Sequence, residues 1–367
     1  MSNSRYFISK SMIQNRSPLF RKIIPYSLFC VIWAKFKHFD KTIHRLVLLA
    51  INLFLWYKNI LYITIKELKM CSKDNYCNEQ KYNNNDKVAL VLEGGALRGL
   101  YTAGVLDVFM ENGIQIDAIF AVSAGALFGI NYKSKQVGRV LRYNLKYARD
   151  KRYMGMYSLC TTGDIMNKEF CFNKLVYELD PLDFETYNNS EVKFYAVVTN
   201  VETGQAEYVE INDAEKDLEY LRASGSMPFV SKLVEINGNK YLDGAVSDPI
   251  PLQKALDMGY GKVIVVQTRP ADYSKSKSWL PFWLVYPKYP KFVKTAQMIY
   301  VKYNETLKLI KQYENDGRIL VLRPSEKIKM RRVEKNLNKL QTIYDVGVKD
   351  CNENLPKIKE YISYNVT

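Results

Sequence analysis

One serine of this sequence stands where a buried strand is expected to turn sharply into a helix. Ser123 follows residues 116–122, which are apolar except for Asp117, and the small residues Ala124, Gly125 and Ala126 come directly after it. A turn of this kind exposes the serine hydroxyl at the end of a strand, where it can attack an acyl group. The pattern therefore predicts a nucleophile elbow and chemistry that proceeds through an acyl-enzyme.

A glycine-rich turn lies upstream of this serine, between a second buried strand expected at residues 87–92 and an amphipathic helix expected at residues 100–112. The turn consists of Gly94, Gly95, Ala96, Leu97, Arg98 and Gly99. In a parallel sheet both strands would end at the same edge, so the backbone N–H groups of the turn can face an acyl oxygen beside Ser123. Preorganised N–H donors stabilise the oxyanion that forms when serine attacks.

The base that would activate this serine is not expected to be a histidine. The chain holds two histidines, His38 and His44, and both precede the α/β region in a stretch unlike an enzyme core. A Ser-His-Asp triad is therefore disfavoured, and a carboxylate is the better base. The best-placed carboxylate is Asp243, which ends a short expected strand and is followed by Gly244 and Ala245.

Together these three motifs resemble those of the patatin-like phospholipase family, and the resemblance covers roughly half the chain. The family's oxyanion loop corresponds to residues 94–99, its Gly-x-Ser-x-Gly elbow to residues 121–125 and its Asp-Gly motif to residues 243–245. The resemblance implies a three-layer α/β fold with a mostly parallel central sheet flanked by helices. It also implies a catalytic dyad of Ser123 and Asp243, a phospholipid or other lipid ester as substrate, and neither a metal ion nor a cofactor.

The sequence departs from the family pattern at two positions. Ala96 replaces the third glycine of the oxyanion loop, and Ala121 replaces the first glycine of the elbow, before Gly125. Each substitution adds a methyl group near tightly packed backbone. If the loop residue needs a positive φ, alanine there costs about 1 kcal/mol and can tilt an oxyanion donor.

The chain divides into three expected parts. Residues 1–86 form a basic, apolar helical extension and linker, residues 87–258 the catalytic domain, and residues 259–367 a C-terminal part that completes the sheet. Further strands are expected at residues 193–200, 206–211, 262–268 and 318–322, and helices at residues 293–314 and 331–351, before a polar tail.

The positive charge is concentrated near the N-terminus. Of a net charge of +15, a surplus of ten falls within residues 1–85, which hold fourteen Lys or Arg and four acidic residues. Two apolar stretches lie there, residues 23–34 and 46–65, and the second reaches about the 20 residues that a bilayer requires. Basic residues beside apolar ones favour a membrane surface over nucleic acid as the partner. We expect either an interfacial anchor or a start of translation at Met70, and composition favours neither.

Cysteine usage indicates a reducing compartment. The six cysteines form no C-x-x-C pair and have no histidine partner at metal-binding spacing. Neither a zinc site nor a disulfide framework is predicted. We expect a cytoplasmic protein that associates with the membrane through its N-terminal segment.

Three later segments are candidates for contact with the lipid or the site. Residues 134–150 predict an amphipathic helix, for which a solvated basic face is favoured over a lipid-binding one. That face consists of Lys135, Arg139, Arg142, Lys146 and Arg149. Residues 161–189 suit a lid or acyl-chain wall. Residues 275–294 interleave six aromatic residues with lysines and prolines, and membrane contact or packing against the C-terminal helices fits them equally well.

Three functions stay open on these residues. A lipid acyl hydrolase is favoured, but an alcohol in place of water would give an acyltransferase, and Ala96 with Ala121 would suit a catalytically silent membrane-binding scaffold. A dinucleotide-binding loop fits poorly, because alanine occupies the second glycine position of G-x-G-x-x-G and the next strand ends on Ser123 instead of an acidic residue.

Overall fold

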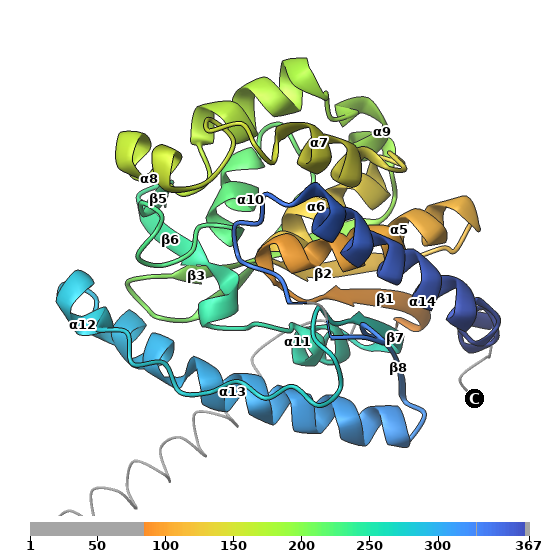
Figure 1. Cartoon of the computed structure of the whole chain (residues 1–367). Coiled ribbons are helices and arrows are strands. Elements are labelled where there is room, and N and C mark those ends of the chain that lie inside the picture. The colour runs from red at the N-terminus through yellow and green to blue at the C-terminus, as the bar shows by residue number, and fades with distance from the viewer. Residues whose placement is uncertain (1–83, 328, 364–367) are drawn as a thin grey trace, which may run out of the picture. The chain divides into compact units, whose positions relative to one another are not determined.

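An eight-stranded sheet organises the residues that the computed structural model describes, 84–327 and 329–363 (Figure 1). The strands are β1 (Asn84–Leu92), β2 (Ala118–Val122), β3 (Lys193–Asn200), β4 (Ala206–Glu210), β5 (Val234–Ile236), β6 (Asn239–Asp243), β7 (Tyr260–Val266) and β8 (Ile319–Leu322). Their order is β5-β6-β3-β2-β1-β7-β8, and β4 pairs with β3. The five strands from β3 to β8 in this order are parallel, while β4, β5 and β6 pair in antiparallel fashion. The sheet is therefore mixed and mostly parallel.

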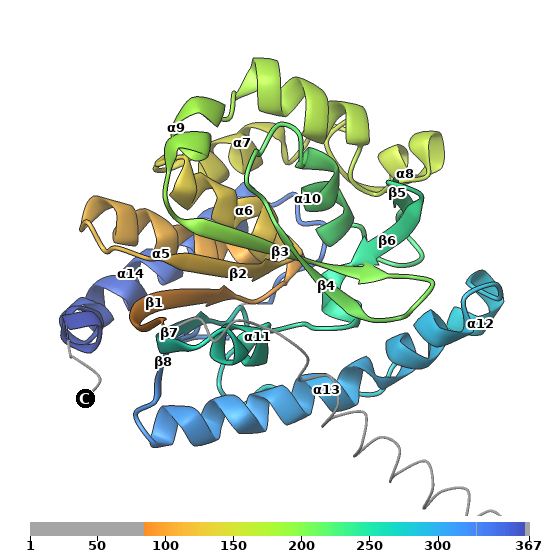
Figure 2. The same ribbon diagram turned by 180° about the vertical axis from the view of Figure 1, so that it is seen from behind.

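Helices cover both faces of this sheet, as Figures 1 and 2 show. They are α5 (Leu100–Glu111), α6 (Ala124–Lys133), α7 (Arg139–Tyr147), α8 (Met156–Thr162), α9 (Phe184–Asn189), α10 (Leu218–Ser224), α11 (Leu252–Asp257), α12 (Phe282–Val285), α13 (Pro290–Asn315) and α14 (Leu337–Ser363). Successive strand residues point to opposite faces. Leu90 and Leu92 of β1 accordingly join the core beneath α5 and α14, whereas Ala89 and Val91 join the core beside α11 and α13.

The first βαβ unit forms where the sequence predicts it. β1 and β2 are parallel neighbours, with Leu92 opposite Ala121, and α5 connects them. The helix ends at Glu111, and Gly113 takes a left-handed φ of 64°, a conformation that favours glycine after a helix. Both strands are buried on both faces, which explains their nearly continuous apolar sequences.

The basic helix expected at residues 134–150 is shorter than predicted, and its basic face is not uniformly solvated. The helix α7 begins at Arg139, after Gly138 adopts a left-handed φ of 72°. Arg139 is only 3% exposed and donates hydrogen bonds to the Asp180 carbonyl and to Asn131 Oδ1. The spacing of basic residues predicts a solvated Arg139, because a local pattern contains no information about its contact with Asp180, which is 41 residues away in the sequence.

The last helix also differs from its prediction. It was expected at residues 331–351 with a polar tail after it, but α14 begins at Leu337 and continues to Ser363 with Pro356 inside it. Pro356 is exposed, so the carbonyl that it leaves without an intrahelical donor can meet water. Ile358 beyond it is fully buried, and this contact with the core holds the final turns in place.

The aromatic segment at residues 275–294 divides between packing and exposure. Phe282, Tyr286 and Phe292 are buried in a small cluster beside β6 and α13. Trp279, by contrast, is 86% exposed, and Trp283 is 62% exposed. The segment therefore packs through one set of rings and presents another set to its surroundings.

Residues 1–83 of the predicted N-terminal extension, with both of its apolar stretches, lie outside the described residues, and the last three residues assigned to it belong to β1. Among the residues that the structure does describe, no helix is long and apolar enough to cross a membrane.

Candidate active site

Ser123 occupies a strained turn between β2 and α6. Its φ of 55° and ψ of −124° lie outside the usual regions for a residue with a side chain, and strain of this kind is concentrated at functional sites. The Ser123 N–H donates to Ser224 Oγ at 2.9 Å, and its carbonyl accepts from the N–H groups of Ala126 and Leu127. The strand-to-helix elbow expected from the sequence is thus present.

Two strand ends bring Ser123 and Asp243 together on one edge of β3. The last residue of β2, Val122, pairs with Val197, while Asp243 at the end of the antiparallel β6 pairs with the next residue, Val198. The other edge of β3 is occupied by β4. β2 and β6 therefore approach each other from opposite directions along the same edge, and the residues at their ends meet.

The meeting produces a short hydrogen bond between two buried side chains. Ser123 Oγ donates to Asp243 Oδ2 at 2.7 Å. Ser123 is 7% exposed and Asp243 4% exposed. A hydroxyl that donates to a carboxylate at this distance has the geometry that general-base activation requires.

Hydrogen bonds around Asp243 hold its carboxylate in one orientation. The Ala245 N–H donates to Asp243 Oδ1 at 2.8 Å. The Asp243 N–H donates to the Ser226 carbonyl, and Thr199 Oγ1 donates to the Asp243 carbonyl, both at 2.8 Å. Ser224 and Ser226 thus support the pair as hydrogen-bond acceptors.

Burial raises the pKa of the Asp243 carboxyl to about 6, although hydrogen bonds from Ala245 and Ser123 and the positive charges of Lys275 and Arg332 oppose this rise. A carboxylate with this pKa is ionised at neutral pH and more basic than an exposed aspartate. Both properties suit a base that must accept a proton from serine.

The glycine-rich loop lies directly against the serine. A Cβ atom on Gly94 would lie 2.9 Å from the Ser123 Cβ atom, so a larger residue would displace the elbow. The N–H groups of Gly95 and Ala96 have no acceptor among the described residues, which leaves them available to an oxyanion. Leu97, Arg98 and Gly99 continue the loop as a 3₁₀ turn.

The two departures from the family pattern have different structural consequences. Ala96 has a φ of 50°, so the left-handed strain anticipated for alanine is present there. Ala121 lies within the regular strand β2, and its side chain is fully buried in the core. A methyl group at position 121 therefore fills space without straining the elbow.

Gly244 is also confined by close packing, since a Cβ atom there would lie 2.1 Å from the Val197 carbonyl oxygen. Gly125 shows the same constraint on the other side of Ser123, where a Cβ atom would lie 2.7 Å from the Leu92 carbonyl oxygen. These contacts explain why both motifs require glycine at these positions.

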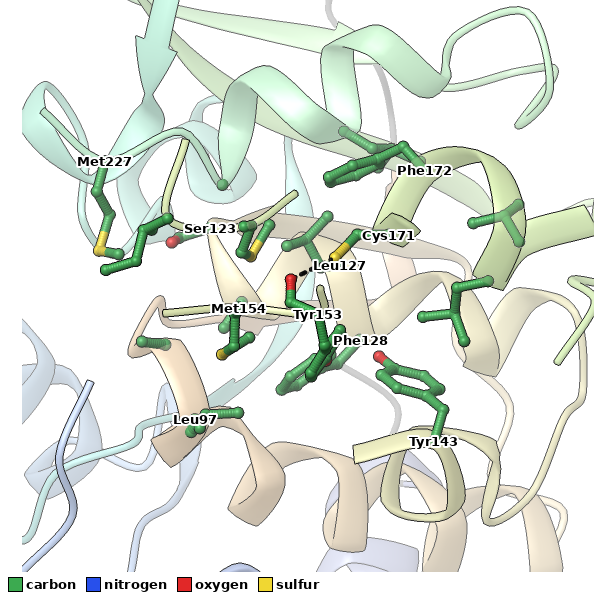
Figure 3. Close-up of a pocket in the computed structure, with 18 of the residues that line it drawn as sticks. Leu97, Ser123, Leu127, Phe128, Tyr143, Tyr153, Met154, Cys171, Phe172 and Met227 are labelled. Atoms are coloured by element: carbon green, nitrogen blue, oxygen red, sulfur yellow. Dashed lines mark hydrogen bonds between the residues drawn. The ribbon is translucent and has the colours of Figure 1, made fainter. Parts of the chain in front are cut away.

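An apolar pocket opens beside Ser123 (Figure 3). It holds about 90 Å³ of free volume. Most of its lining is aliphatic, aromatic or sulfur-containing, as with Leu97, Leu127, Phe128, Met154, Cys171 and Phe172. Part of the wall comes from the π-helical segment Phe170–Leu179, inside the region expected to border an acyl chain. The pocket can accept an alkyl chain and offers it few polar contacts.

Three residues near the pair could not be found from sequence motifs. Glu93 is buried after β1 and accepts hydrogen bonds from Tyr303 Oη at 2.5 Å and the Thr268 N–H at 2.6 Å. Lys275 and Arg332 contribute positive charge near Asp243. Lys275 and Arg332 lie in segments without recognisable motifs, and the only signal from Glu93 is its place before the glycine-rich turn.

Comparison with known proteins identifies two matching family models. Residues 90–256 match the model described as "Patatin-like phospholipase". Residues 289–363 match a "Domain of unknown function (DUF6363)". The first match contains the glycine-rich loop, Ser123 and Asp243, whereas the second contains the whole of α13, β8 and α14.

Related sequences are distant. The chain is 24% identical over 269 residues to "Uncharacterized protein YjjU" of Escherichia coli, an alignment that covers 71% of this chain and 75% of that protein. It is 26% identical over 296 residues to "Lysophospholipase NTE1" of Cryptococcus neoformans, which covers 75% of this chain but 17% of the longer protein. The crystal structure of VipD from Legionella pneumophila aligns with a TM-score of 0.38 and 11% identity, over 76% of this chain and 67% of that chain.

Proposed function

Residues 90–256 of this chain belong to the patatin-like phospholipase family, and from this premise we propose that the protein is a serine lipid acyl hydrolase in which Ser123 is the nucleophile and Asp243 is its base. The observation that carries the proposal is the 2.7 Å hydrogen bond from Ser123 Oγ to Asp243 Oδ2 beside an apolar pocket. The substrate is a lipid ester of the phospholipid or lysophospholipid class.

Acylation begins when Ser123 Oγ attacks the ester carbonyl carbon and its proton passes to Asp243. Backbone N–H groups of the loop stabilise the negative charge on the carbonyl oxygen. Those of Gly95 and Ala96 are suited to this role, because they donate to no acceptor among the described residues. The tetrahedral intermediate then expels the alcohol, which takes the proton from Asp243. The acyl group stays on Ser123, with its alkyl chain in the apolar pocket.

Deacylation repeats these steps with water. Asp243 accepts a proton from the water as the water oxygen attacks the acyl carbon. Collapse of the second tetrahedral intermediate breaks the bond to Ser123 Oγ, which recovers the proton from Asp243. The fatty acid leaves, and the pair returns to its starting state.

Asp243→Asn and Ser123→Ala test this assignment. Asparagine keeps the shape of the side chain but cannot accept the proton, so either change should lower turnover of a short-chain ester at least about 10³-fold. The double variant should be scarcely worse, because the two residues act as one unit. Fluorophosphonate should label the wild type at Ser123 and leave Ser123→Ala unlabelled.

The controls concern folding and the two histidines. His38→Ala combined with His44→Ala should retain hydrolysis. Circular dichroism must show that the Asp243→Asn protein is folded. Wild-type turnover by that folded variant, or loss of turnover in the histidine variant, would contradict the proposed dyad. An unlabelled wild type would favour the silent scaffold.

We further propose that the aromatic segment contacts an anionic membrane surface. Residues 275–294 contain five lysines and no acidic residue, and Trp279 and Trp283 are exposed among them. The Phe229 ring packs against the rings of Phe282 and Tyr286, with distances between ring centroids of 4.8 and 5.9 Å. Met227, two residues before Phe229, lines the apolar pocket. The aromatic segment that carries the exposed Trp279 and Trp283 therefore packs against the chain segment that borders this pocket. Tryptophan and lysine favour the interfacial layer of a bilayer.

Replacement of Trp279 and Trp283 by serine should lower binding to phosphatidylglycerol vesicles about tenfold or more in a sedimentation assay. The ratio of activity on vesicles to activity on dissolved ester should fall in parallel. Met298→Ser provides the control, because Met298 is 49% exposed on α13 but lies outside the aromatic segment. Equal vesicle binding by the tryptophan variant and the wild type would exclude this surface.

A further inference from the structure

A second pocket lies beside residues that contact the Ser123–Asp243 pair, and it differs in character from the apolar one: Gly94 packs against Ser123, and the Ala245 N–H donates to Asp243. It is lined by Gly94 of the glycine-rich loop and Ala245 of the Asp-Gly motif, together with Arg98, Arg269 and Lys275. It holds about 60 Å³ of free volume, which is room for a small polar group and a few waters but not for an alkyl chain. We call it the cationic pocket.

The three cations of this pocket are held close together without ion-pair partners. Among the described residues, none of Arg98, Arg269 and Lys275 takes part in a salt bridge. The guanidinium of Arg269 lies over the Tyr273 ring at 4.3 Å, and Lys275 Nζ lies 5.1 Å from the Tyr303 ring centroid. Arg98 Nε is buried and has no hydrogen-bond acceptor.

Carboxylates near the pocket do not saturate these cations. Glu93 is the one carboxylate in the lining, and each of its oxygens already accepts a hydrogen bond, from Tyr303 or from Thr268. Burial also raises the pKa of Glu93, which favours its neutral form. Burial lowers the pKa of both Arg98 and Lys275, and the charge of Arg269 lowers each further; Glu93 raises the pKa of both cations and Asp243 raises that of Lys275, but the pKa of each stays below its ordinary value. A bound anion would relieve this mutual repulsion.

The backbone that carries Lys275 is fixed in place. Asn304 of α13 accepts a hydrogen bond from the Lys275 N–H at 2.8 Å and donates one to its carbonyl at 2.9 Å. When a ligand binds, the Lys275 backbone therefore has little further freedom to lose, and the ordering cost falls on its side chain. The backbone beneath this cation is in place before any ligand enters.

We infer that the cationic pocket binds the phosphate group of a lipid headgroup while the acyl chain of the same molecule lies in the apolar pocket. The inference rests on the proposed hydrolase function. Two guanidinium forks and an ammonium suit the several oxygens of a phosphate ester. The two pockets border the pair through different residues, Ala96 and Ser123 on the apolar side and Gly94 and Ala245 on the cationic side. A phospholipid would thus place its ester between its two recognised parts.

The test compares dihexanoyl phosphatidic acid with dihexanoylglycerol, which carry the same acyl chains with and without a phosphate. We expect the wild type to prefer the phosphate-bearing ester. Arg269→Gln and Lys275→Met should each lower the ratio of kcat/KM for phosphatidic acid to kcat/KM for the neutral ester about tenfold or more. Measurement at pH 8 keeps Asp243 ionised, so that loss of the Lys275 charge does not alter the protonation of the base.

Lys311→Gln is the matched control, since Lys311 is an exposed lysine on α13 outside both pockets. It removes one positive charge and should leave the ratio at the wild-type value. Because the ratio is taken within each variant, a partly unfolded sample lowers both rates together and does not mimic the effect. Equal ratios in the wild type, Arg269→Gln and Lys275→Met would overturn the inference.

A Tm measurement with inorganic phosphate distinguishes two possible ligands of the cationic pocket, a lipid headgroup and free phosphate. If phosphate raises the Tm of the wild type but not of Arg269→Gln, and the substrate ratio is nevertheless unchanged, the pocket binds free phosphate and the headgroup assignment is wrong. Absence of hydrolysis for both esters would instead contradict the proposed function itself, whereas hydrolysis of both with equal ratios contradicts only the headgroup site.

Discussion

The apolar pocket is lined by Ser123 itself, whereas the cationic pocket reaches the reacting pair through Gly94 and Ala245, and the two pockets are built largely from different parts of the chain. Nearly all of the apolar lining comes from residues 96–227, inside the region that matches the phospholipase family. Arg269, Tyr273, Lys275 and Tyr303 of the cationic pocket all follow that region. The family region thus supplies the reacting pair, a place for an alkyl chain and Arg98, while later segments supply Arg269 and Lys275, the other two cations of the cationic pocket.

The difference also appears in how each pocket acts on the reacting pair. Positive charge at Lys275 lowers the pKa of Asp243 against the effect of burial. The apolar pocket is lined mostly by neutral side chains, but Arg332 in its lining acts on the pKa of Asp243 in the same direction as Lys275. Loss of the Lys275 or Arg332 charge should therefore alter the pH dependence of catalysis, and changes to the neutral side chains of the apolar pocket should alter chain-length preference.

The largest expected effect is on pH dependence. Asp243 acts as a base only when ionised, and its pKa is about 6, so kcat/KM on a neutral short-chain ester should fall about tenfold per pH unit below this value and level off above it. Lys275→Met should shift the profile to higher pH, because it removes a charge that favours the carboxylate. A profile without a transition between pH 4 and 8 would contradict the assignment of the base.

The same pKa gives a stability prediction for Asp243→Asn. Burial raises the pKa of Asp243 in the native state above its ordinary value, so between about pH 4 and 6 the native state binds more protons at this group than the unfolded state does. The stability that protonated Asp243 contributes at low pH is therefore lost as the pH rises through this range. Asparagine avoids the buried charge, so the variant should exceed the wild type in unfolding free energy at pH 8, by up to about 3 kcal/mol. The gain should vanish near pH 4. A less stable variant at pH 8 would show that the asparagine amide loses needed hydrogen bonds.

A change on the apolar side should have a smaller effect, confined to long chains. Cys171→Phe places a ring in the pocket, and kcat/KM for a dodecanoyl ester relative to a butanoyl ester should fall about tenfold, at a cost of about 1–3 kcal/mol for overpacking. Cys160→Phe is the matched control, because Cys160 is exposed and does not line the pocket. An unchanged chain-length preference in Cys171→Phe would place the acyl chain elsewhere.

The smallest effect is expected at Ala96, which lines the apolar pocket on the loop that separates the two sites. Glycine there removes the left-handed strain of alanine but adds freedom to the unfolded chain, so the unfolding free energy should change by less than about 1 kcal/mol. Turnover should be unchanged or rise up to about threefold as a donor relaxes toward its best direction. Ala121→Gly should instead lower the unfolding free energy by about 1 kcal/mol, since it removes a buried methyl group. A large loss of turnover in Ala96→Gly would show that the alanine methyl group is needed.

Local sequence was sufficient to predict much of the fold and the candidate residues of the site. The apolar runs and glycines of residues 87–127 predict β1, the loop, α5 and β2, because buried parallel strands and a tight elbow each leave a short-range pattern. Predictions were weaker where no such pattern exists. The burial of Arg139 depends on Asp180, and the extension of α14 past Pro356 depends on burial of Ile358.

The sequence by itself determined that Ser123 ends a buried strand, that a glycine-rich loop precedes it and that Asp243 is the best carboxylate. Only the tertiary structure decided that Ser123 and Asp243 meet, because their contact depends on β2 and β6 pairing with adjacent residues of β3 from opposite directions. It alone also decided that Arg98, Arg269 and Lys275 share a pocket. Strand pairing and charge clustering join residues far apart in the chain, and such contacts leave no periodic pattern in the sequence around either partner.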